Sequence, residues 1–424
     1  MDRQIRKLGA ALLVLFVVLL GQVTYIQVFA SQRLADNPAN ARRQLIAEYG
    51  VDRGSILAAD GRTVLASSRT SPGELKYQRR YPQGPLYAGV TGYYSIIFGR
   101  TELEQSFNSF LSASAPELLP QTLADQILGR PKQGATIVTT IDPVIQRAAA
   151  RALGSLPGAV VALDPRTGDV KAIVANPTYD PNELSSQDPK VVRAAWEELN
   201  SDPDKPLLSR AIDELFPPGS TFKIVTAAAA LENGFGPEPG AGDLGFDIPL
   251  EAGVFPYTSY FQDRLPAVAI SAIGQDNVAA NPMQMALVAA AIANGGMQMR
   301  PRLVTEIRDP TGQVIESFQP EVWGRPISAE TAIQLTQMMV NVVRAGTGTA
   351  AQITGVDVAG KTGTAQHGEG LAPHAWFVSF APVQNPEVVV AVIVLDGGSL
   401  GDEATGGQVA APIAKAVMEA ALDG

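Results

Sequence analysis

The most informative stretch of this chain is FPPGSTFK, residues 216–223, which runs directly into an apolar segment. The two prolines disfavour helix before them and Gly219 permits a sharp turn, so the pattern predicts a helix that begins near Ser220 and ends around Asn233-Gly234. Ser220 and Lys223 are spaced so that both side chains lie on one helical face. The lysine amine could there take the proton of the serine hydroxyl, so the pair has the composition of a nucleophile with a base beside it.

A serine at a helix start is most often only a capping residue, so the S-x-x-K spacing alone is a weak signal. A second signal is GKTGT at residues 360–364, which follows Val358 and precedes the strand-like run 375–380. Penicillin-sensitive serine acyl-transferases combine S-x-x-K with a downstream K-T-G motif. This chain carries both motifs in that order.

Several further short blocks follow one family pattern in register along the chain. They are RGxI at 53–56, DG at 60–61, GYYS at 92–95, TID at 140–142, ALDPxTG at 162–168, AIGQ at 272–275 and HAWF at 374–377. With these blocks the chain resembles a class B penicillin-binding protein, a membrane-anchored peptidoglycan D,D-transpeptidase, of the actinobacterial penicillin-binding protein A type. The resemblance covers nearly the whole chain.

The resemblance implies an α/β (α+β) fold of the transpeptidase and serine β-lactamase kind, with a five-stranded antiparallel sheet flanked by helices, a β-rich N-terminal module and one transmembrane helix. The C-terminal sequence pattern agrees with this fold. Expected strands are 158–163 and 170–174, which form a hairpin, then a strand from Val358 into the K-T-G motif, 375–380 and 388–395, and expected helices are 282–294, 330–343 and 409–422. Their methionines are expected in the core.

In such an enzyme Ser220 attacks the carbonyl between the two terminal D-alanines of a stem peptide. An exposed lysine has a pKa of about 10.4 and is protonated near neutral pH, so we expect burial or a second cation to lower the pKa of Lys223. Lys361 is the candidate cation, and it would also attract the terminal carboxylate of the substrate.

The rest of the K-T-G motif supplies the expected substrate-binding residues. Thr362 and Thr364 would donate hydroxyl hydrogen bonds, and Gly363 would let the strand backbone approach closely. The backbone N–H groups of Ser220 and Thr364 would bind the oxyanion. His374 could form a triad with Ser220, but no acidic partner is evident in the sequence, and a structural role at a strand start is the expected alternative.

Composition excludes other classes of chemistry. The chain has 424 residues, no cysteine and two histidines, so we expect no cofactor, no thiolate or histidine-rich metal site and no disulfide. A formal net charge of −10 argues against a nucleic-acid partner. By resemblance, the partners are peptidoglycan stem peptides and lipid-linked precursors, β-lactams, and a membrane glycosyltransferase of the cell-wall synthesis machinery.

The N-terminal segment predicts a membrane anchor. Residues 8–30 carry no charge and exceed the ~20 residues needed to cross a bilayer. Arg3, Arg6 and Lys7 precede them, which places the N-terminus in the cytoplasm and the body outside the plasma membrane. A cleaved signal peptide ending near 28–30 is the alternative. The expected division of the chain is a cytoplasmic tail 1–7, a transmembrane anchor 8–30, an N-terminal spacer or dimerisation module 31–141 and a transpeptidase domain 142–424.

The middle motif of the family, S-x-N, is missing between Lys223 and Ser271, an interval that is longer in relatives. Ser106-x-Asn108 has the spacing but lies before the nucleophile, and we do not expect it to be catalytic. Three accounts stay open: a divergent enzyme of low activity, a catalytically impaired scaffold of the division or elongation machinery, and an internally deleted copy. A β-lactamase is a less favoured reading, since no E-x-x-L-N deacylating segment is present.

Overall fold

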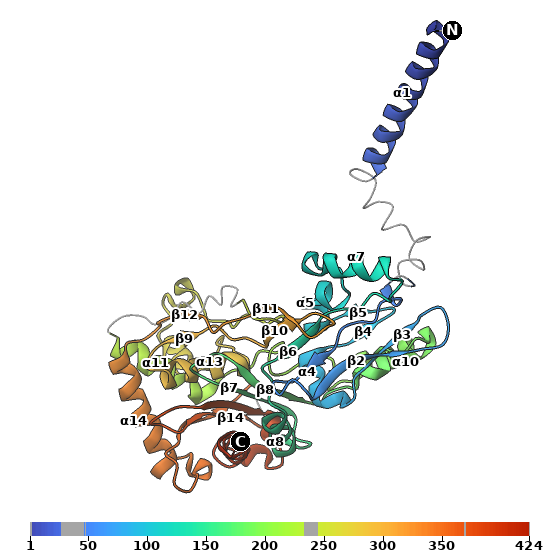
Figure 1. Ribbon diagram of the computed structural model, residues 1–424. Coiled ribbons are helices and arrows are strands. Elements are labelled where there is room, and N and C mark those ends of the chain that lie inside the picture. The colour runs from blue at the N-terminus through green and yellow to red at the C-terminus, as the bar shows by residue number, and fades with distance from the viewer. Residues whose placement is uncertain (1, 27–45, 47, 233–244, 369, 424) are drawn as a thin grey trace.

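The computed structural model describes residues 2–26, 46, 48–232, 245–368 and 370–423 (Figure 1). The first helix, α1 (Asp2–Tyr25), contains one apolar window, Arg6–Tyr25, that is long enough to cross a membrane. None of that window is buried against the described chain. The predicted N-terminal apolar helix is therefore present, and it is a candidate membrane span.

A five-stranded sheet forms the centre of the C-terminal part, in the order β13-β14-β15-β7-β8 with every neighbouring pair antiparallel. Its strands are β7 (Gly158–Leu163), β8 (Val170–Asn176), β13 (Ala359–Ala365), β14 (His374–Ala381) and β15 (Val388–Val394). Every residue of β14 and β15 is buried, because both faces of the sheet are covered and their branched and aromatic side chains suit a central strand. The predicted five-stranded antiparallel sheet is confirmed.

Alternate side chains of this sheet belong to two hydrophobic clusters, one on each face. One face packs on α8 (Pro143–Leu153) and α15 (Ala410–Leu422), and the other on α13 (Pro282–Ala293) and α11 (Lys223–Leu231) (Figure 1). Helix α14 (Ala329–Ala345) lies along β13. Of the methionines in the predicted helices, Met283, Met285, Met339 and Met418 are buried, whereas Met338 is exposed.

The N-terminal module contains a six-stranded sheet in the order β11-β10-β6-β1-β2-β3. Strands β1 (Ile56–Leu57), β2 (Val64–Thr70), β3 (Tyr77–Arg80) and β6 (Thr136–Thr139) come from the N-terminal part, whereas β10 (Val304–Arg308) and β11 (Val314–Ser317) follow the nucleophile helix in sequence. Short helices complete the module, among them α4 (Ala88–Thr91), α5 (Glu102–Ser106) and α7 (Leu119–Ile127). Residues 304–317 thus connect the two modules, because they follow the nucleophile helix in sequence but pair with strands of the N-terminal module. A domain boundary between residues 141 and 142 does not include this connection.

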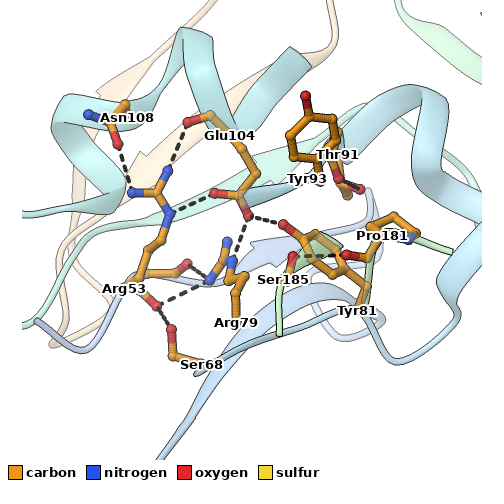
Figure 2. Close-up of polar contacts among 12 residues, drawn as sticks. Arg53, Ser68, Arg79, Tyr81, Thr91, Tyr93, Glu104, Asn108, Pro181 and Ser185 are labelled. Carbon is orange, nitrogen blue, oxygen red and sulfur yellow. Dashed lines mark hydrogen bonds and ion pairs between the residues drawn. The ribbon is translucent and has the colours of Figure 1, made fainter. Parts of the chain in front are cut away.

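A buried charged cluster, formed by Arg53, Arg79 and Glu104, organises the N-terminal module (Figure 2). The Glu104 carboxylate lies between the two guanidinium groups, at 2.6 Å from Arg53 Nε and 2.5 Å from Arg79 Nε. Burial alone would raise the pKa of Glu104, but the charges and hydrogen bonds of the two arginines outweigh it and hold that pKa below its ordinary value. Arg53 Nη1 also donates to Asn108 Oδ1 at 2.8 Å, so the asparagine of the rejected S-x-N match belongs to this cluster.

Candidate active site

The nucleophile motif begins as one 3-10 turn, Gly219–Phe222, that continues into α11, Lys223–Leu231. The predicted helix start near Ser220 is therefore confirmed. Gly219 has φ of 53°, and a Cβ added there would lie 2.7 Å from the Thr364 carbonyl oxygen. Only glycine allows this turn to pack so closely on the K-T-G strand.

Two contacts hold the segment before the nucleophile in place. Phe216 exchanges two backbone hydrogen bonds with Ala280, at 3.0 and 2.9 Å. The indole Nε1 of Trp376, a fully buried residue of β14, donates to the Pro217 carbonyl at 3.0 Å. The prolines are thus anchored to the central sheet, so the position of Ser220 is set by the most buried part of the fold.

A turn at Gly274 contacts the nucleophile turn from the other side. Gly219 N–H donates to the Gly274 carbonyl at 2.8 Å, and a Cβ at Gly274 would lie 2.4 Å from the Gly219 carbonyl oxygen. Sequence reasoning noted the AIGQ block at 272–275 as a family feature but gave it no function. Its position next to Gly219 indicates that it supports the nucleophile turn.

The K-T-G strand, β13, is the edge strand beside this turn. A Cβ at Gly363 would lie 2.9 Å from Thr221 Cγ2 and 3.0 Å from the Pro218 carbonyl oxygen, so the strand backbone lies close to the nucleophile turn at this position. Thr364 is exposed, whereas Thr362 is buried and shares a hydrogen bond of 2.6 Å with the Thr347 hydroxyl. The two threonines expected to bind substrate therefore differ in accessibility.

The structure brings the two lysines of the motifs near each other, and the two side chains differ in burial. Lys223 is exposed, and Lys361 is partly buried with its Nζ donating to the Thr362 carbonyl at 2.8 Å. Burial, followed by the positive charge of Lys223, lowers the pKa of Lys361 to about 8. The second cation expected beside Lys223, Lys361, therefore lies near it.

His374 contacts Phe216, His367 and Asp396. Its Nδ1 accepts a hydrogen bond from the Asp396 backbone N–H at 3.2 Å and lies 3.7 Å from an Asp396 carboxylate oxygen. The acidic neighbour that the sequence did not reveal is therefore Asp396. Burial, followed by the charge of His367, lowers the pKa of His374 to about 4, so its imidazole is neutral near pH 7. The ring packs edge-on against Phe216 at 5.6 Å between centroids, which favours the structural role.

His367, His374 and Asp396 also bring their ligand atoms within 4.8 Å of one another, which is the composition of a divalent metal site. The two imidazole rings, however, are stacked 3.8 Å apart at 13°. A metal ion lies close to the plane of each imidazole that binds it, so two stacked rings cannot bind the same ion in this arrangement.

Comparison with known proteins identifies the family. The model of the penicillin-binding protein transpeptidase domain matches residues 158–239 and 240–419, and that of the penicillin-binding protein A dimerisation domain matches residues 53–137. The chain therefore belongs to the penicillin-binding protein transpeptidase family, in the group of penicillin-binding protein A.

Two relatives are similar to this chain along almost their full length. The chain is 38% identical to the peptidoglycan D,D-transpeptidase PbpA of Mycolicibacterium smegmatis, with 100% of this chain and 99% of the relative aligned. It is 37% identical to PbpA of Mycobacterium tuberculosis H37Rv, with both chains fully aligned. The solved structure of the M. tuberculosis penicillin-binding protein A, as a ceftriaxone acyl-enzyme, matches with a TM-score of 0.81 at 36% identity and covers 89% of this chain and 100% of that one.

These alignments also bear on the missing motif. The alignment with the M. smegmatis relative has 492 positions for a chain of 424 residues, so 68 positions (492 − 424) have no counterpart here. The transpeptidase match is interrupted between residues 239 and 240. That break falls in 233–244, the stretch where we place the missing S-x-N segment, and this stretch lies outside the described residues.

Proposed function

We propose that this chain is a β-lactam-binding peptidoglycan D,D-transpeptidase that cross-links stem peptides through a serine acyl-enzyme. The observation that carries the proposal is the packing of the S-x-x-K turn against the edge strand that bears K-T-G, on a chain whose full-length relatives are named D,D-transpeptidases. The scaffold and β-lactamase readings are not favoured, because the similarity to these transpeptidases extends over the whole chain.

Ser220 Oγ attacks the carbonyl between the terminal D-alanines while its proton passes to Lys223 Nζ. The N–H groups of Ser220 and Thr364 hold the oxyanion of the tetrahedral intermediate. The C–N bond then breaks, the leaving nitrogen receives a proton, and D-alanine departs. The amine of a second stem peptide attacks the Ser220 ester, which forms the cross-link and returns the proton to the serine oxygen.

Lys361 has a different role in this scheme. Its partly buried ammonium provides positive charge next to Lys223. The same charge attracts the substrate carboxylate, with the exposed Thr364 hydroxyl as a hydrogen-bond donor beside it. Gly363 keeps the strand close to the nucleophile turn. The hydroxyl of the buried Thr362 shares a hydrogen bond with the Thr347 hydroxyl and supports the strand from its inner side.

The test of the acyl-enzyme is intact-protein and peptide mass spectrometry after reaction with a fluorescent penicillin. We expect one penicilloyl adduct on the peptide that contains Ser220, and no adduct in Ser220→Ala. The exposed Ser201→Ala variant at the end of α10 (Pro189–Ser201) is the matched control and should label like the parent. A folded parent protein that never labels would overturn the proposal in favour of a scaffold.

The missing S-x-N segment should limit peptide turnover more than penicillin binding. A β-lactam keeps its leaving nitrogen tethered after ring opening, whereas D-alanine must be protonated and released. General acid–base catalysis contributes about 10²–10⁴-fold, and we expect a loss of that size in cross-linking. Grafting the S-x-N segment of a close relative between Phe235 and Leu244 should restore cross-linking of lipid-linked strands. If the unmodified chain already matches an intact relative, another group supplies the proton relay.

We further propose that α1 is an uncleaved anchor in the plasma membrane, with residues 1–7 inside and the body outside. The basic residues before the apolar window support this orientation. In this arrangement residues 31–141 raise the transpeptidase domain, 142–424, above the bilayer and contact a membrane glycosyltransferase. Protease added to intact spheroplasts should digest the body, and protection of the whole chain would contradict the orientation.

A further inference from the structure

Helix α7 (Leu119–Ile127) of the N-terminal module exposes large apolar side chains to solvent. Ile127 is 86% exposed, Leu128 directly after the helix is 62% exposed, and Leu119 is 52% exposed. Leu119 and Ile127 lie on nearly the same side of the helix, because their spacing is close to two full turns. Apolar side chains that gather on one surface element, unlike single scattered ones, mark an interaction surface. We call these three residues the α7 apolar face.

The side chains of α7 that are less accessible to solvent are polar. Gln121, Thr122 and Asp125 are half-buried, and the buried Leu118 fixes the start of the helix to the module. A surface helix of a globular module normally buries its apolar side and exposes its polar side. In α7 the arrangement is reversed, so its outer side suits an apolar surrounding better than water.

The position of α7 indicates which apolar surrounding it meets. Residues 48–52 are the first continuous part of the body after α1, and they pair with the segment that follows α7. The Asp52 N–H donates to the Lys132 carbonyl at 3.0 Å, and the Asp52 carbonyl accepts from the Gly134 N–H at 2.8 Å. Helix α7 therefore lies at the edge of the body where the chain arrives from the candidate membrane span (Figure 1).

The charged residues near α7 fit the headgroup region of a bilayer. Arg130 is exposed and Lys132 is half-buried, and both follow the helix at the end that pairs with Asp52. Of the acidic residues in this segment, Asp125 is on the polar side of the helix and Glu117 lies before its start. An interfacial helix inserts its apolar side chains at the boundary of headgroups and acyl chains, and nearby basic residues are attracted to lipid phosphates.

We propose that α7 docks on the outer surface of the membrane that α1 spans. Leu119, Ile127 and Leu128 insert at the boundary between headgroups and acyl chains, and the Arg130 guanidinium contacts lipid phosphates. The inference rests on the membrane anchor proposed above, and it adds a second point at which the N-terminal module is held against the bilayer. The transpeptidase domain then keeps one orientation above the membrane instead of turning about its tether.

The experiment uses the absence of cysteine from this chain. The full chain with Leu128→Cys, labelled with nitrobenzoxadiazole, is reconstituted at high lipid excess into vesicles of phosphatidylglycerol and phosphatidylcholine that contain an acyl-chain nitroxide lipid. We expect the nitroxide to quench this label at least about threefold more than a label at Val314→Cys. Val314, on β11, is the control because it is another exposed apolar residue of the same six-stranded module.

A second substitution tests the apolar contact itself. In the Leu128→Cys chain, Ile127→Gln should reduce quenching at least about twofold, because a polar side chain opposes insertion. Ile333→Gln, at an exposed position of α14, is the matched control and should leave quenching unchanged. Both substitutions are at exposed positions, and penicillin labelling of Ser220 in the same vesicles shows that each variant is folded.

Flotation of the vesicles after an alkaline wash reports the insertion of α1 separately. A chain that floats, and in which positions 128 and 314 are quenched equally or not at all, would overturn the docking and leave the anchor and the transpeptidase proposal intact. Self-quenching at position 128 that rises with protein density, without quenching by the nitroxide lipid, would place a second copy of the chain on this face and would also overturn the docking. A chain released by the wash would contradict the anchor, and the docking with it.

Discussion

Two regions of this molecule each bring two cationic side chains together, and they do so differently. In the N-terminal module, Arg53 and Arg79 flank the buried carboxylate of Glu104. In the candidate active site, Lys223 and Lys361 lie near each other, and among the described residues no carboxylate offsets their effect on the pKa of Lys361. The two arginines share an anion that lies between them, and the two lysines do not.

The difference shows that this fold uses arginines where a charge only supports the structure and lysines where the site has to react. Arginine stays protonated under all ordinary conditions and binds a carboxylate through a rigid set of donors, so the N-terminal cluster has one protonation state near neutral pH. A lysine changes its pKa readily when it is buried or placed beside another cation, and the pKa of Lys361 falls to about 8. Lys361 can therefore exchange its proton near pH 8.

Removing the anion from the N-terminal cluster should have the largest effect. Glu104→Ala leaves two buried guanidinium groups without their shared carboxylate, and breaking such a pair costs about 3–5 kcal/mol of unfolding free energy. Urea denaturation of the chain measures this loss. The exposed Glu117→Ala should change stability by less than about 0.5 kcal/mol. A loss at Glu104 no larger than that at Glu117 would contradict the structural role of the cluster.

The same cluster predicts a dependence of stability on acid. Because the folded pKa of Glu104 is lowered, its contribution is complete above the unfolded pKa of about 4.3 and is lost as pH falls through the folded value. Acid titrations of the parent and of Glu104→Gln should therefore converge below about pH 4. A constant difference in stability down to the lowest pH would show that charge is not the reason for the effect.

In the active site, removing one cation should reduce acylation more than removing the nearby histidine. We expect Lys361→Ala to lower the second-order rate of acylation by fluorescent penicillin about 10²-fold, because the charge near Lys223 and the carboxylate is lost. His374→Ala, whose neutral ring packs on Phe216, should lose less than about tenfold at matched thermal stability. Equal or reversed losses would mean that the electrostatics of the site are assigned wrongly.

The pH profile sharpens the contrast between lysine and arginine. Above about pH 8 Lys361 loses its proton, so acylation by an anionic penicillin should decline by about tenfold for each pH unit. Lys361→Arg keeps its charge, and its profile should stay flat through that range even if its absolute rate is lower. The acylation rates of the parent and of Lys361→Arg should be measured between about pH 6.5 and about pH 9.5. Parallel declines in the two proteins would contradict the prediction.

The smallest expected effect concerns the anchor of the nucleophile segment. Trp376→Phe removes the hydrogen bond to the Pro217 carbonyl and should cost about 1 kcal/mol of unfolding free energy. Val378→Ala, on the same strand and also buried, is the control for loss of packing alone. If Ser220 is positioned through this bond, Trp376→Phe should slow acylation at a temperature where both variants are folded, and Val378→Ala should not.

The five-stranded antiparallel sheet followed from the family resemblance, whereas local sequence patterns predicted its individual strands and the start of the nucleophile helix, since each of these depends on neighbouring residues. They did not predict that Asp396 approaches His374 or that Trp376 binds Pro217, because those pairs are distant in sequence and meet only through tertiary packing. Spacing shows which side chains share a helical face but not how solvent reaches them, so it did not show that Lys223 is exposed and that Lys361 is partly buried.

The six-stranded sheet of the N-terminal module has a consequence for how the protein is made. Strand β6 pairs with β1 on one side and with β10 on the other, and β10 is synthesised only after the nucleophile helix. Until the ribosome has produced residues 304–317, the β6 edge has open N–H and C=O groups that can pair with other chains. A nascent chain that stalls in this interval, or a fragment that ends there, is therefore exposed to aggregation and is a natural client for a chaperone.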